Sequence, residues 1–536
     1  MTEKLSSSHR KARVLMIQGT NSDVGKSLIV AGLCRAFARQ GWRVRPFKAQ
    51  NMSNNAAVTI DSEASPHPDG TPRRGEIGRA QALQAKACGA PPSVHMNPIL
   101  LKPQSDINCQ LVLRGRALGT YSAAAYQAMK RELLPAVLES LQKLAGEADL
   151  VLIEGAGCGA EQYLRANDIS NMGLSEAADL PAILLGEDSR GGMTAAALGA
   201  YQLFSDSERS RIKGFLVNRF RGDPAIFAPA AEQITRCTGW PNLGLIRWFN
   251  KACSLAPEDS LALDQGQGQG QGNATRKTDQ LHIVVPRLPR VANFDDLEPL
   301  AAEPGVAISW IPPGTPLPRD ADIVMLPGSK ATRSDLEFLY QQGWHHDIHA
   351  HVRHGGYLVG LCGGFQMLGQ TIRDPHGIEG SPGEIAGLGY IDMATEIGGD
   401  KKLIELDSTD LLSDCRISGY EMHMGRSFGP GLENPWLLLK DADGLAAEFT
   451  PEQGESPRPE GAQSPSGRVM GGYLHGIFNS DDFRSHWLTK VAGQPSSINY
   501  TARIESTLDA LAAQLEEDLD LNALWQLAEE PALISK

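Results

Sequence analysis

Short apolar segments alternate with helix-like segments along the first half of the chain. Apolar runs at 12–19, 149–155, 181–186 and 212–218 each end at a glycine or a polar residue. Uninterrupted apolar runs of this length are typical of parallel strands that are buried on both faces of a sheet. Between the first two runs, residues 26–41 have helical spacing and end at a glycine. The alternation predicts an α/β domain built on a parallel sheet.

A low-complexity run separates the two halves of the chain. The residues "DQGQGQGQGNATRKTD" (264–279) cannot form a hydrophobic core, so we expect an interdomain linker there. Beyond it the same alternation returns, with apolar strands expected within 281–290, 322–330 and 356–364. The second half is therefore predicted to be a second α/β domain.

The chain is predicted to have five parts. Its 536 residues are too many for one hydrophobic core. The acidic C-terminal stretch shows helical spacing of leucine and alanine, and we expect it to pack as a terminal helix. The expected parts are a flexible tail, a P-loop domain, the linker, a second α/β domain and a helical tail, at 1–11, 12–263, 264–280, 281–500 and 501–536.

Composition and charge narrow the classes of function. With 41% hydrophobic and 21% charged residues, the chain resembles an ordinary soluble globular protein. The net charge of -13 and the lack of a basic stripe argue against a nucleic-acid partner. The eight cysteines form no C-x-x-C pair, which argues against a zinc site and for a reducing compartment. No stretch suits a signal peptide or a membrane span, so we expect a cytoplasmic protein without a membrane partner.

A phosphate-binding loop is predicted at "GTNSDVGKS" (19–27), between the first expected strand and the first expected helix. Backbone N–H groups and the helix N-terminus attract phosphate oxygens there. Lys26 is expected to reach the outer phosphates, and the Ser27 hydroxyl is expected to bind Mg²⁺. The loop is one residue longer than the common form, and in this it resembles the dethiobiotin synthetase-like branch of P-loop proteins. The predicted ATP-binding residues are Gly19, Thr20, Gly25, Lys26 and Ser27.

Two charged residues are expected beside this loop. Glu154 ends an apolar run, and a carboxylate at that end of a parallel strand points into the ligand crevice. It is a candidate Mg²⁺ ligand, directly or through water. Lys48 is a candidate contact for a phosphate or a carboxylate. For both residues the alternative is a solvated surface group.

One cysteine is a candidate nucleophile. In "GYLVGLCGGFQMLG" (356–369) an apolar run stops at Cys362, and two glycines and a helix-like stretch follow. His475 ends another apolar run, in "GGYLHGIF" (471–478). A thiolate forms near neutral pH only beside a base or a cation, and imidazole is the usual one. We predict that Cys362 and His475 act together, against the alternative of a buried core thiol.

Backbone amides are expected beside this cysteine, because a tetrahedral intermediate needs hydrogen-bond donors. The Gly363 N–H and an amide near Gly328 or Ser329, in the "LPGSK" turn, are the predicted oxyanion donors. Glycine at these positions lets the backbone approach the reacting carbon.

The motifs together resemble a known family. "GLCGGFQMLG" with "GGYLHGIF" is similar to the class I glutamine amidotransferase domain of the cobalamin-synthesis type. This resemblance implies a dethiobiotin synthetase-like P-loop domain with a parallel sheet, followed by a flavodoxin-like amidotransferase domain. The motifs that resemble the cobyric acid synthase family over nearly the whole chain are "GTNSDVGKS", "PFKAQNMSNN", "EIGRAQALQA", "MNPILLKP", "NRFRGD", "LPGSK" and "GYEMHMG".

The resemblance also implies a reaction. Members of that family amidate the b, d, e and g carboxylates of adenosylcobyrinic acid a,c-diamide to give adenosylcobyric acid, with glutamine and Mg-ATP as co-substrates. Cys362 would release ammonia from glutamine while His475 moves the protons. The P-loop domain would activate the carboxylates of the corrinoid. So acidic a substrate needs cationic contacts, for which we select Lys48, Arg79, Lys102 and Arg221.

The chain departs from the family pattern at three places. Class I amidotransferases usually have a Glu two positions after the histidine, but this chain has Ile477, so we predict a Cys–His pair without a third catalytic member. The segments 155–161 and 186–192 also differ from the usual family sequences beside the expected crevice.

The histidine-rich segment 345–356 is interpreted as a solvated helix. For His423, a place near the amidotransferase site and a purely structural role are both open.

Two alternative functions remain at this point. One is an a,c-diamide synthase, or an amidotransferase acting on another polycarboxylate. The other is a P-loop switch of the partitioning-ATPase kind, which would bind partners in its ATP state. A switch of this kind would give Cys362 and His475 no catalytic role, and it is disfavoured for that reason.

Overall fold

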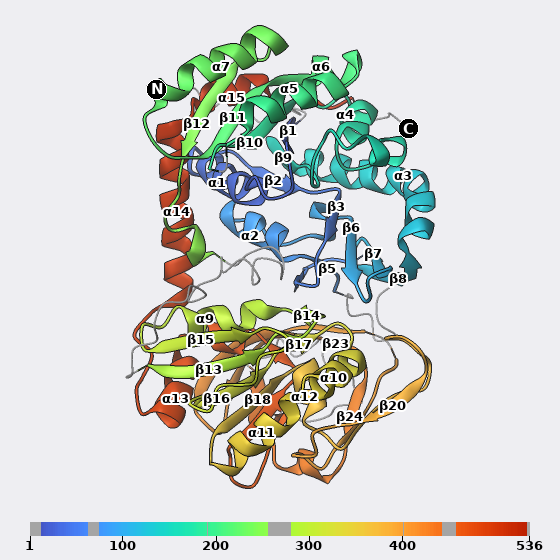
Figure 1. The fold of residues 1–536 in the computed structure, drawn as a ribbon, viewed down its shortest axis with the longest axis vertical. Helices are drawn as coiled ribbons and strands as arrows, with labels where there is room; N and C mark the ends of the chain where they lie inside the picture. The colour runs from blue at the N-terminus through green and yellow to red at the C-terminus, as the bar shows by residue number, and fades with distance from the viewer. Residues whose placement is uncertain are drawn as a thin grey trace.

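The computed structural model describes residues 12–62, 74–189, 191–255, 280–399, 401–441 and 457–532. Two α/β units lie one above the other along the long axis, the N-terminal unit in blue and green and the C-terminal unit in yellow and orange (Figure 1). The expected tail at 1–11 and all but the last residue of the expected linker at 264–280 lie outside the described residues. The predicted class, two α/β domains, is confirmed.

The N-terminal unit is built on a six-stranded parallel sheet. Its strands are β1 (Arg13–Gly19), β2 (Val44–Phe47), β9 (Leu150–Glu154), β10 (Ala182–Glu187), β11 (Ile212–Phe220) and β12 (Asn242–Arg247), in the spatial order β12-β11-β10-β1-β9-β2. The apolar side chains of the central strands are buried on both faces, as their continuous apolar runs predict. Because Ile17 pairs with Glu154, the loop after β1 and the end of β9 meet at one edge.

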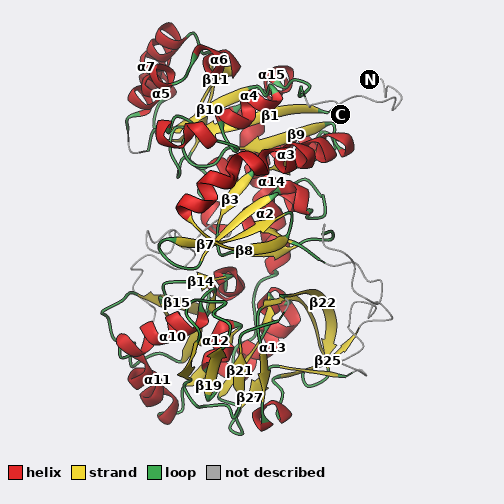
Figure 2. Cartoon of the chain, turned by 90° about the vertical axis from the view of Figure 1, so that its right-hand side faces the viewer, coloured by secondary structure: helices red, strands yellow, loops and turns green. Residues whose placement is uncertain are grey.

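Helices cover both faces of this sheet (Figure 2). The first one begins directly after the predicted phosphate loop. Gly25 precedes it with φ of 90°, a left-handed conformation that favours glycine. The helices of the unit are α1 (Lys26–Arg39), α3 (Ala123–Glu147), α4 (Met172–Ala178), α5 (Met193–Leu203), α6 (Asp206–Arg211) and α7 (Pro224–Thr238), with 3₁₀ turns η1 (Val94–Met96), η2 (Gln162–Asn167) and η3 (Ala252–Ser254).

An insertion after β2 lies between the main sheet and the C-terminal unit (Figure 1). It contains helix α2 (Arg79–Ala87) and two small sheets. The first sheet has the order β3-β6-β7-β8, and the second is one antiparallel pair. The strands are β3 (Gln50–Met52), β6 (Ile99–Pro103), β7 (Asn108–Leu113), β8 (Arg116–Ser122), and the pair β4 (Ala56–Val58) and β5 (Glu76–Gly78).

The C-terminal unit has a second six-stranded sheet, which is parallel except at one edge. Its strands are β13 (Leu281–Pro286), β15 (Val306–Ile311), β16 (Ile323–Leu326), β18 (Tyr357–Leu361), β27 (Ala462–Gln463) and β28 (Val469–Gly472), in the order β15-β13-β16-β18-β28-β27. The helical segments around it are η4 (Phe294–Leu297), α9 (Glu298–Ala301), α10 (Thr332–Gln341), α11 (Trp344–Arg353), α12 (Gly363–Met367), η5 (Pro430–Glu433), η8 (Ile477–Asn479) and α13 (Asp481–Ala492).

Three smaller sheets complete the C-terminal unit. Strands β14 (Val291–Ala292) and β17 (Gly328–Ser329) pair beside the main sheet. A four-stranded sheet holds β19 (Thr371–Asp374), β20 (Gly383–Ala386), β21 (Ala394–Glu396) and β24 (Arg426–Phe428). A five-stranded antiparallel sheet holds β22 (Lys402–Asp410), β23 (Cys415–His423), β25 (Leu437–Asp441), β26 (Arg458–Glu460) and β29 (Leu474–His475).

The C-terminal residues return to the N-terminal unit. Helices α14 (Tyr500–Asp518) and α15 (Leu521–Leu527) share one buried apolar cluster with α1 and β1. Gly32 of α1 permits this contact, because a Cβ there would lie 2.5 Å from a methyl carbon of Leu515. Figure 1 shows α14 in red beside the N-terminal unit. Among the described residues, no helix combines the length and the apolar character needed to cross a bilayer.

Candidate active sites

The predicted phosphate loop curls around its own lysine. Lys26 Nζ donates hydrogen bonds to the carbonyl oxygens of Asn21 at 2.9 Å, Ser22 at 3.1 Å and Gly157 at 2.8 Å. Glycine at position 19 permits this arrangement, since a Cβ there would lie 2.7 Å from the backbone carbonyl oxygen of Asn21. The backbone N–H of Thr20 donates to a carbonyl of β10 and is therefore engaged within the sheet. The structure thus holds a buried ammonium group at the mouth of the loop.

A buried carboxylate lies beside the loop. Glu154, 1% exposed, accepts a hydrogen bond from Ser27 Oγ at 2.8 Å and lies 2.9 Å from Lys48 Nζ. Its other oxygen accepts from Gln84 Nε2 at 2.6 Å. Ser27, Lys48 and Glu154, selected from separate motifs, are therefore brought together. Gln84 was missed, and its only sequence signal is its place in "EIGRAQALQA".

Cys362 lies on a strained elbow between β18 and α12. Its φ of 50° and ψ of −105° are unusual for a residue with a side chain, and such strain gathers at functional sites. Two glycines permit the tight turn. A Cβ on Gly360 would lie 2.5 Å from the carbonyl oxygen of Gly364, and one on Gly364 would lie 2.1 Å from that of Leu326. The thiol is 8% exposed, so the elbow presents it at the edge of a packed core.

A carboxylate holds the histidine of the site. His475 Nδ1 lies 2.7 Å from Asp296 Oδ2, and Asp296 Oδ1 accepts the Gly476 N–H at 2.7 Å. Burial lowers the pKa of His475, but the charge of Asp296 and the neighbouring Cys362 raise it further, so the net shift is well above the usual value. The expectation of a Cys–His pair without an acid is therefore wrong. The acid lies in η4, 181 positions before Ile477 in the sequence, and folding brings it to the turn that begins at Gly476.

The predicted oxyanion glycines flank this pair closely. A Cβ on Gly363 would lie 2.8 Å from the backbone nitrogen of Ser329, and a Cβ on Gly328 would lie 3.3 Å from His475 Cε1. Tyr420 stacks on the His475 ring with centroids 5.2 Å apart. Side chains larger than hydrogen would therefore fill the space next to the reacting groups.

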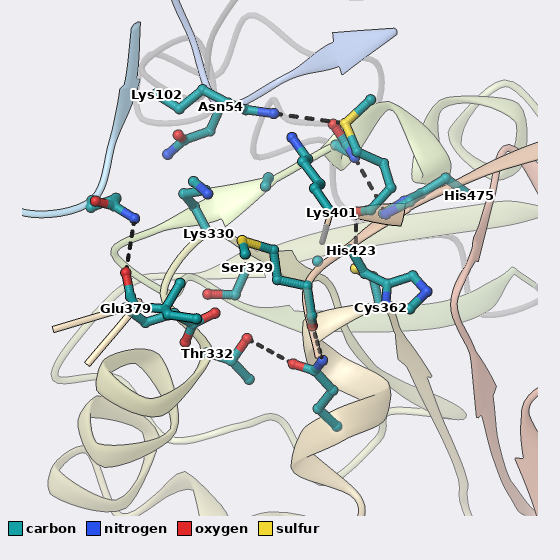
Figure 3. Close-up of a pocket in the computed structure, with 18 residues that line it drawn as sticks. Asn54, Lys102, Ser329, Lys330, Thr332, Cys362, Glu379, Lys401, His423 and His475 are labelled. Carbon is teal, nitrogen blue, oxygen red and sulfur yellow. Dashed lines mark hydrogen bonds between the residues drawn. The ribbon is translucent and has the colours of Figure 1, made fainter. Parts of the chain in front are cut away.

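A pocket in front of Cys362 and His475 is lined by both units (Figure 3). Three lysines line it, and Lys102 Nζ lies 2.7 Å from Glu76 Oε2, with Lys401 paired to the same carboxylate. These cations lower the pKa of Glu76 to about 2, against the effect of burial. The lining residues are Asn54, Lys102 and Gln104 of the N-terminal unit, and Ala292, Asn293, Gly328, Ser329, Lys330, Thr332, Cys362, Gln366, Ile378, Glu379, Lys401, Met422, His423, Met424 and His475 of the C-terminal unit.

Comparison with family models matches each unit separately. Residues 15–261 match the CobQ/CobB/MinD/ParA nucleotide binding domain. Residues 282–483 match the CobB/CobQ-like glutamine amidotransferase domain. These two domain matches confirm the predicted use of ATP and of glutamine.

Relatives match almost from end to end. A protein named cobyric acid synthase from Caulobacter sp. (strain K31) is 49% identical over 96% of this chain and 99% of its own length. Another of that name, from Methylobacterium nodulans, is 50% identical over 96% of this chain and 99% of its own length. The chain belongs to the cobyric acid synthase family. A third relative of that name, from Brucella suis biovar 1, is 46% identical over 96% of this chain.

Two solved structures each match a part of the chain. One described as a glutamine amidotransferase covers 39% of the chain at 17% identity, with a TM-score of 0.27 and 98% of its own chain matched. The MinC:MinD cell division protein complex of Aquifex aeolicus covers 45% at 14% identity, with a TM-score of 0.24 and 83% of that chain matched.

The four cations selected for the acidic substrate of this family do not meet at one place. Lys48 lies at the phosphate loop, whereas Lys102 lines the pocket of Cys362. Arg79 Nε lies 3.0 Å from Asp295 Oδ2, at the contact between the two units. The Arg221 guanidinium stacks over Trp248 at 3.8 Å from the ring centroid. Lys102 and Arg79 have buried carboxylate partners, which sequence spacing does not reveal.

The position of His423 answers the question that the sequence left open. It lines the pocket and stacks on Tyr473 with centroids 3.8 Å apart. Burial lowers the pKa of His423, although Glu421 opposes this effect. His423 therefore lies beside the predicted site as part of its wall.

Proposed function

We propose that this chain amidates the b, d, e and g carboxylates of adenosylcobyrinic acid a,c-diamide to give adenosylcobyric acid, using glutamine and ATP. The observation that carries this proposal is the composite site of Cys362, His475 and Asp296 on the same chain as a phosphate loop with Lys26, Ser27 and Glu154. The family membership supplies the substrate, and the two sites supply the two half-reactions.

The first half-reaction releases ammonia from glutamine. His475 takes the proton of the Cys362 thiol, and the sulfur attacks the amide carbon of glutamine. Asp296 holds Nδ1 of the ring, so that Nε2 serves the thiol, as in other nucleophile–histidine–acid sites. The imidazolium returns the proton to the leaving ammonia, and water then hydrolyses the thioester to glutamate. Amides beside Gly363 and Gly328 are suited to stabilise the oxyanion.

We propose that the head group of glutamine binds between Lys330 and Glu379, on the wall of the same pocket. No carboxylate of the described residues lies within ion-pair distance of Lys330 Nζ, so this cation is open to a ligand. Burial and the nearby Lys102 lower the pKa of Lys330 to about 8. Burial raises the pKa of Glu379 to about 7. A cation and a carboxylate on one wall match the α-carboxylate and the α-ammonium of an amino acid.

The second half-reaction joins ammonia to the corrinoid. The phosphate loop and Lys26 would bind ATP, and a corrinoid carboxylate would attack the γ-phosphate to give an acyl phosphate and ADP. Ammonia then displaces phosphate to form the amide. Ser27 Oγ and the Glu154 carboxylate, 2.8 Å apart, offer the oxygen donors that Mg²⁺ prefers. Bound there, Mg²⁺ would neutralise phosphate charge.

The test is to incubate the full chain with adenosylcobyrinic acid a,c-diamide, Mg-ATP and glutamine, and to follow the mass of the corrinoid. Four successive amidations support the proposal. Turnover of ATP and glutamine without amidation of this corrinoid would exclude the substrate and favour another polycarboxylate. Absence of glutamate release and of ATP turnover would exclude the ligase reaction itself.

A further inference from the structure

Helix α2 touches both candidate active sites. Its first residue, Arg79, contacts the C-terminal unit, and Gln84 contacts the carboxylate beside the phosphate loop. The two residues are five positions apart along the helix, which is a rise of about 7.5 Å. A short rigid element of this kind moves as one body.

At one end, Arg79 contacts the residue that precedes the acid of the histidine. Arg79 Nε lies 3.0 Å from Asp295 Oδ2, and Asp295 is the neighbour of Asp296 in η4. Burial raises the pKa of Asp295, and Arg79 works against that shift. Glu298 is also buried nearby, with its pKa raised to about 8 by burial and by Asp295. Arg79 is therefore the cation that faces the buried carboxyl group of Asp295, next to the pair of Asp296 and His475.

At the other end, Gln84 contacts the proposed Mg²⁺ ligand. Its Nε2 donates to Glu154 Oε2 at 2.6 Å and to the carbonyl oxygen of Ser27 at 3.3 Å. A cation bound by Glu154 would compete for the carboxylate oxygens that Gln84 and Lys48 now hold. Binding of Mg-ATP would therefore change the contact that Gln84 makes at this end of α2, and a contact that differs between two states is what coupling requires.

We propose that Arg79 is a positioning residue of the glutaminase site and that α2 conveys nucleotide binding to it. This inference rests on the proposed functions of both sites. It makes the N-terminal unit a structural part of the glutaminase, although the nucleophile, the base and the acid all belong to the C-terminal unit.

The role of Arg79 is tested by the kcat and KM for glutamate release from glutamine in the full chain. Arg79→Met is expected to lower kcat about tenfold or more with little change in KM, because Asp296 loses its fixed position. Arg79→Lys is expected to retain part of kcat. The double variant Arg79→Met/Asp295→Asn is expected to recover part of it, since no buried carboxylate is then left without a cation. Lys86→Met, at a solvent-facing position of the same helix whose amine lies 3.8 Å from Glu505, is the matched control and is expected to match wild type.

Ammonium-driven amidation separates positioning from general damage. In the Arg79→Met variant, glutamate release is expected to fall at least about fivefold more than ammonium-driven amidation, since the phosphate loop is untouched. An unchanged kcat for glutamate release would overturn the role of Arg79. An equal loss of both activities would also overturn it, because it would indicate disruption of the N-terminal unit.

The coupling is tested with Mg²⁺ and a non-hydrolysable ATP analogue. The rate of glutamate release by wild type is expected to change on their addition, and Gln84→Leu is expected to abolish that change. An identical wild-type rate with and without the nucleotide would overturn the coupling, and so would an intact response in Gln84→Leu. Wild type that releases no glutamate under any condition would instead contradict the proposed glutaminase function, and this inference with it.

Discussion

His475 Nδ1 lies 2.7 Å from Asp296 Oδ2, although the two residues are 179 positions apart in the chain. The second oxygen of Asp296 binds the backbone N–H of Gly476, so the carboxylate fixes both the ring and the turn that follows it. The family member thus keeps an acid in contact with its histidine while its sequence has isoleucine at the usual acid position.

Replacing the acid is expected to impair the glutaminase alone. Asp296→Asn removes the charge that stabilises the imidazolium, so kcat for glutamate release should fall about 100-fold or more. Amidation with ammonium should persist, since it bypasses His475. Stopped assays of glutamate and of amidated corrinoid measure the two activities. Unchanged glutamate release would show that the acid has no role in catalysis.

The KM for glutamine is expected to depend on pH because two titratable residues, Lys330 and Glu379, line the pocket. Lys330 is cationic below about pH 8, and Glu379 is anionic above about pH 7, so both charges coexist mainly between these values. KM should therefore be lowest there and rise up to about tenfold per pH unit on either side. Initial rates over a range of glutamine concentrations and pH values measure this profile.

Two substitutions by uncharged residues show which residue causes the rise in KM on each side of the pH profile. Lys330→Met should remove the rise in KM above pH 8, and Glu379→Gln should remove the rise below pH 7. Each should also raise KM at neutral pH. If both variants keep the wild-type profile, the head group of glutamine binds elsewhere.

Replacing Glu154 is expected to impair the amidation of the corrinoid while glutamate release continues. Glu154→Gln keeps the size of the side chain but removes the charge proposed for Mg²⁺. Amidation should fall by about two orders of magnitude with glutamine and with ammonium alike. Glutamate release without nucleotide should continue. An amidation rate equal to that of wild type would place the metal away from this carboxylate.

The packing of α14 on α1 gives a prediction about stability. Gly32→Ala adds a Cβ that would lie 2.5 Å from Leu515 Cδ1 and 2.8 Å from Leu511 Cγ, so it should lower the free energy of unfolding by about 1–3 kcal/mol. Gly199→Ala is the matched control in α5, where no atom lies within 4 Å of the added carbon. It should raise that free energy by about 0.5–1 kcal/mol. Urea unfolding of both variants measures the difference, and equal effects would contradict the close packing.

Sequence patterns predicted those parts of the structure that depend on residues close together in the chain. The strand–loop–helix at 19–27 depends on neighbouring residues, and the elbow at Cys362 depends on the glycines around it. The parallel sheets follow from continuous apolar runs. Asp296 and Gln84 were missed for the opposite reason. Each acquires its role only through a contact made by folding. Asp296 lies in none of the motifs, and the motif "EIGRAQALQA" that contains Gln84 does not indicate its carboxylate partner.

The four cations selected as substrate contacts show the same limit of prediction from sequence. Sequence indicates that an acidic substrate needs lysine or arginine, but it does not indicate which cations already have a carboxylate partner. Lys102 pairs with Glu76 and Arg79 pairs with Asp295, and both pairs lie where the two units meet. The composite pocket depends on that contact, and no single segment encodes it.

The most direct measurement follows the source of the nitrogen in the product. Glutamine labelled with ¹⁵N in its side-chain amide is supplied with unlabelled ammonium, Mg-ATP and adenosylcobyrinic acid a,c-diamide, and the corrinoid is analysed by mass spectrometry. Wild type should place ¹⁵N in all four new amides, whereas Cys362→Ser should form the same amides from unlabelled ammonium only. Label in the product of Cys362→Ser, or its absence from the product of wild type, would contradict the transfer of ammonia from Cys362 to the corrinoid.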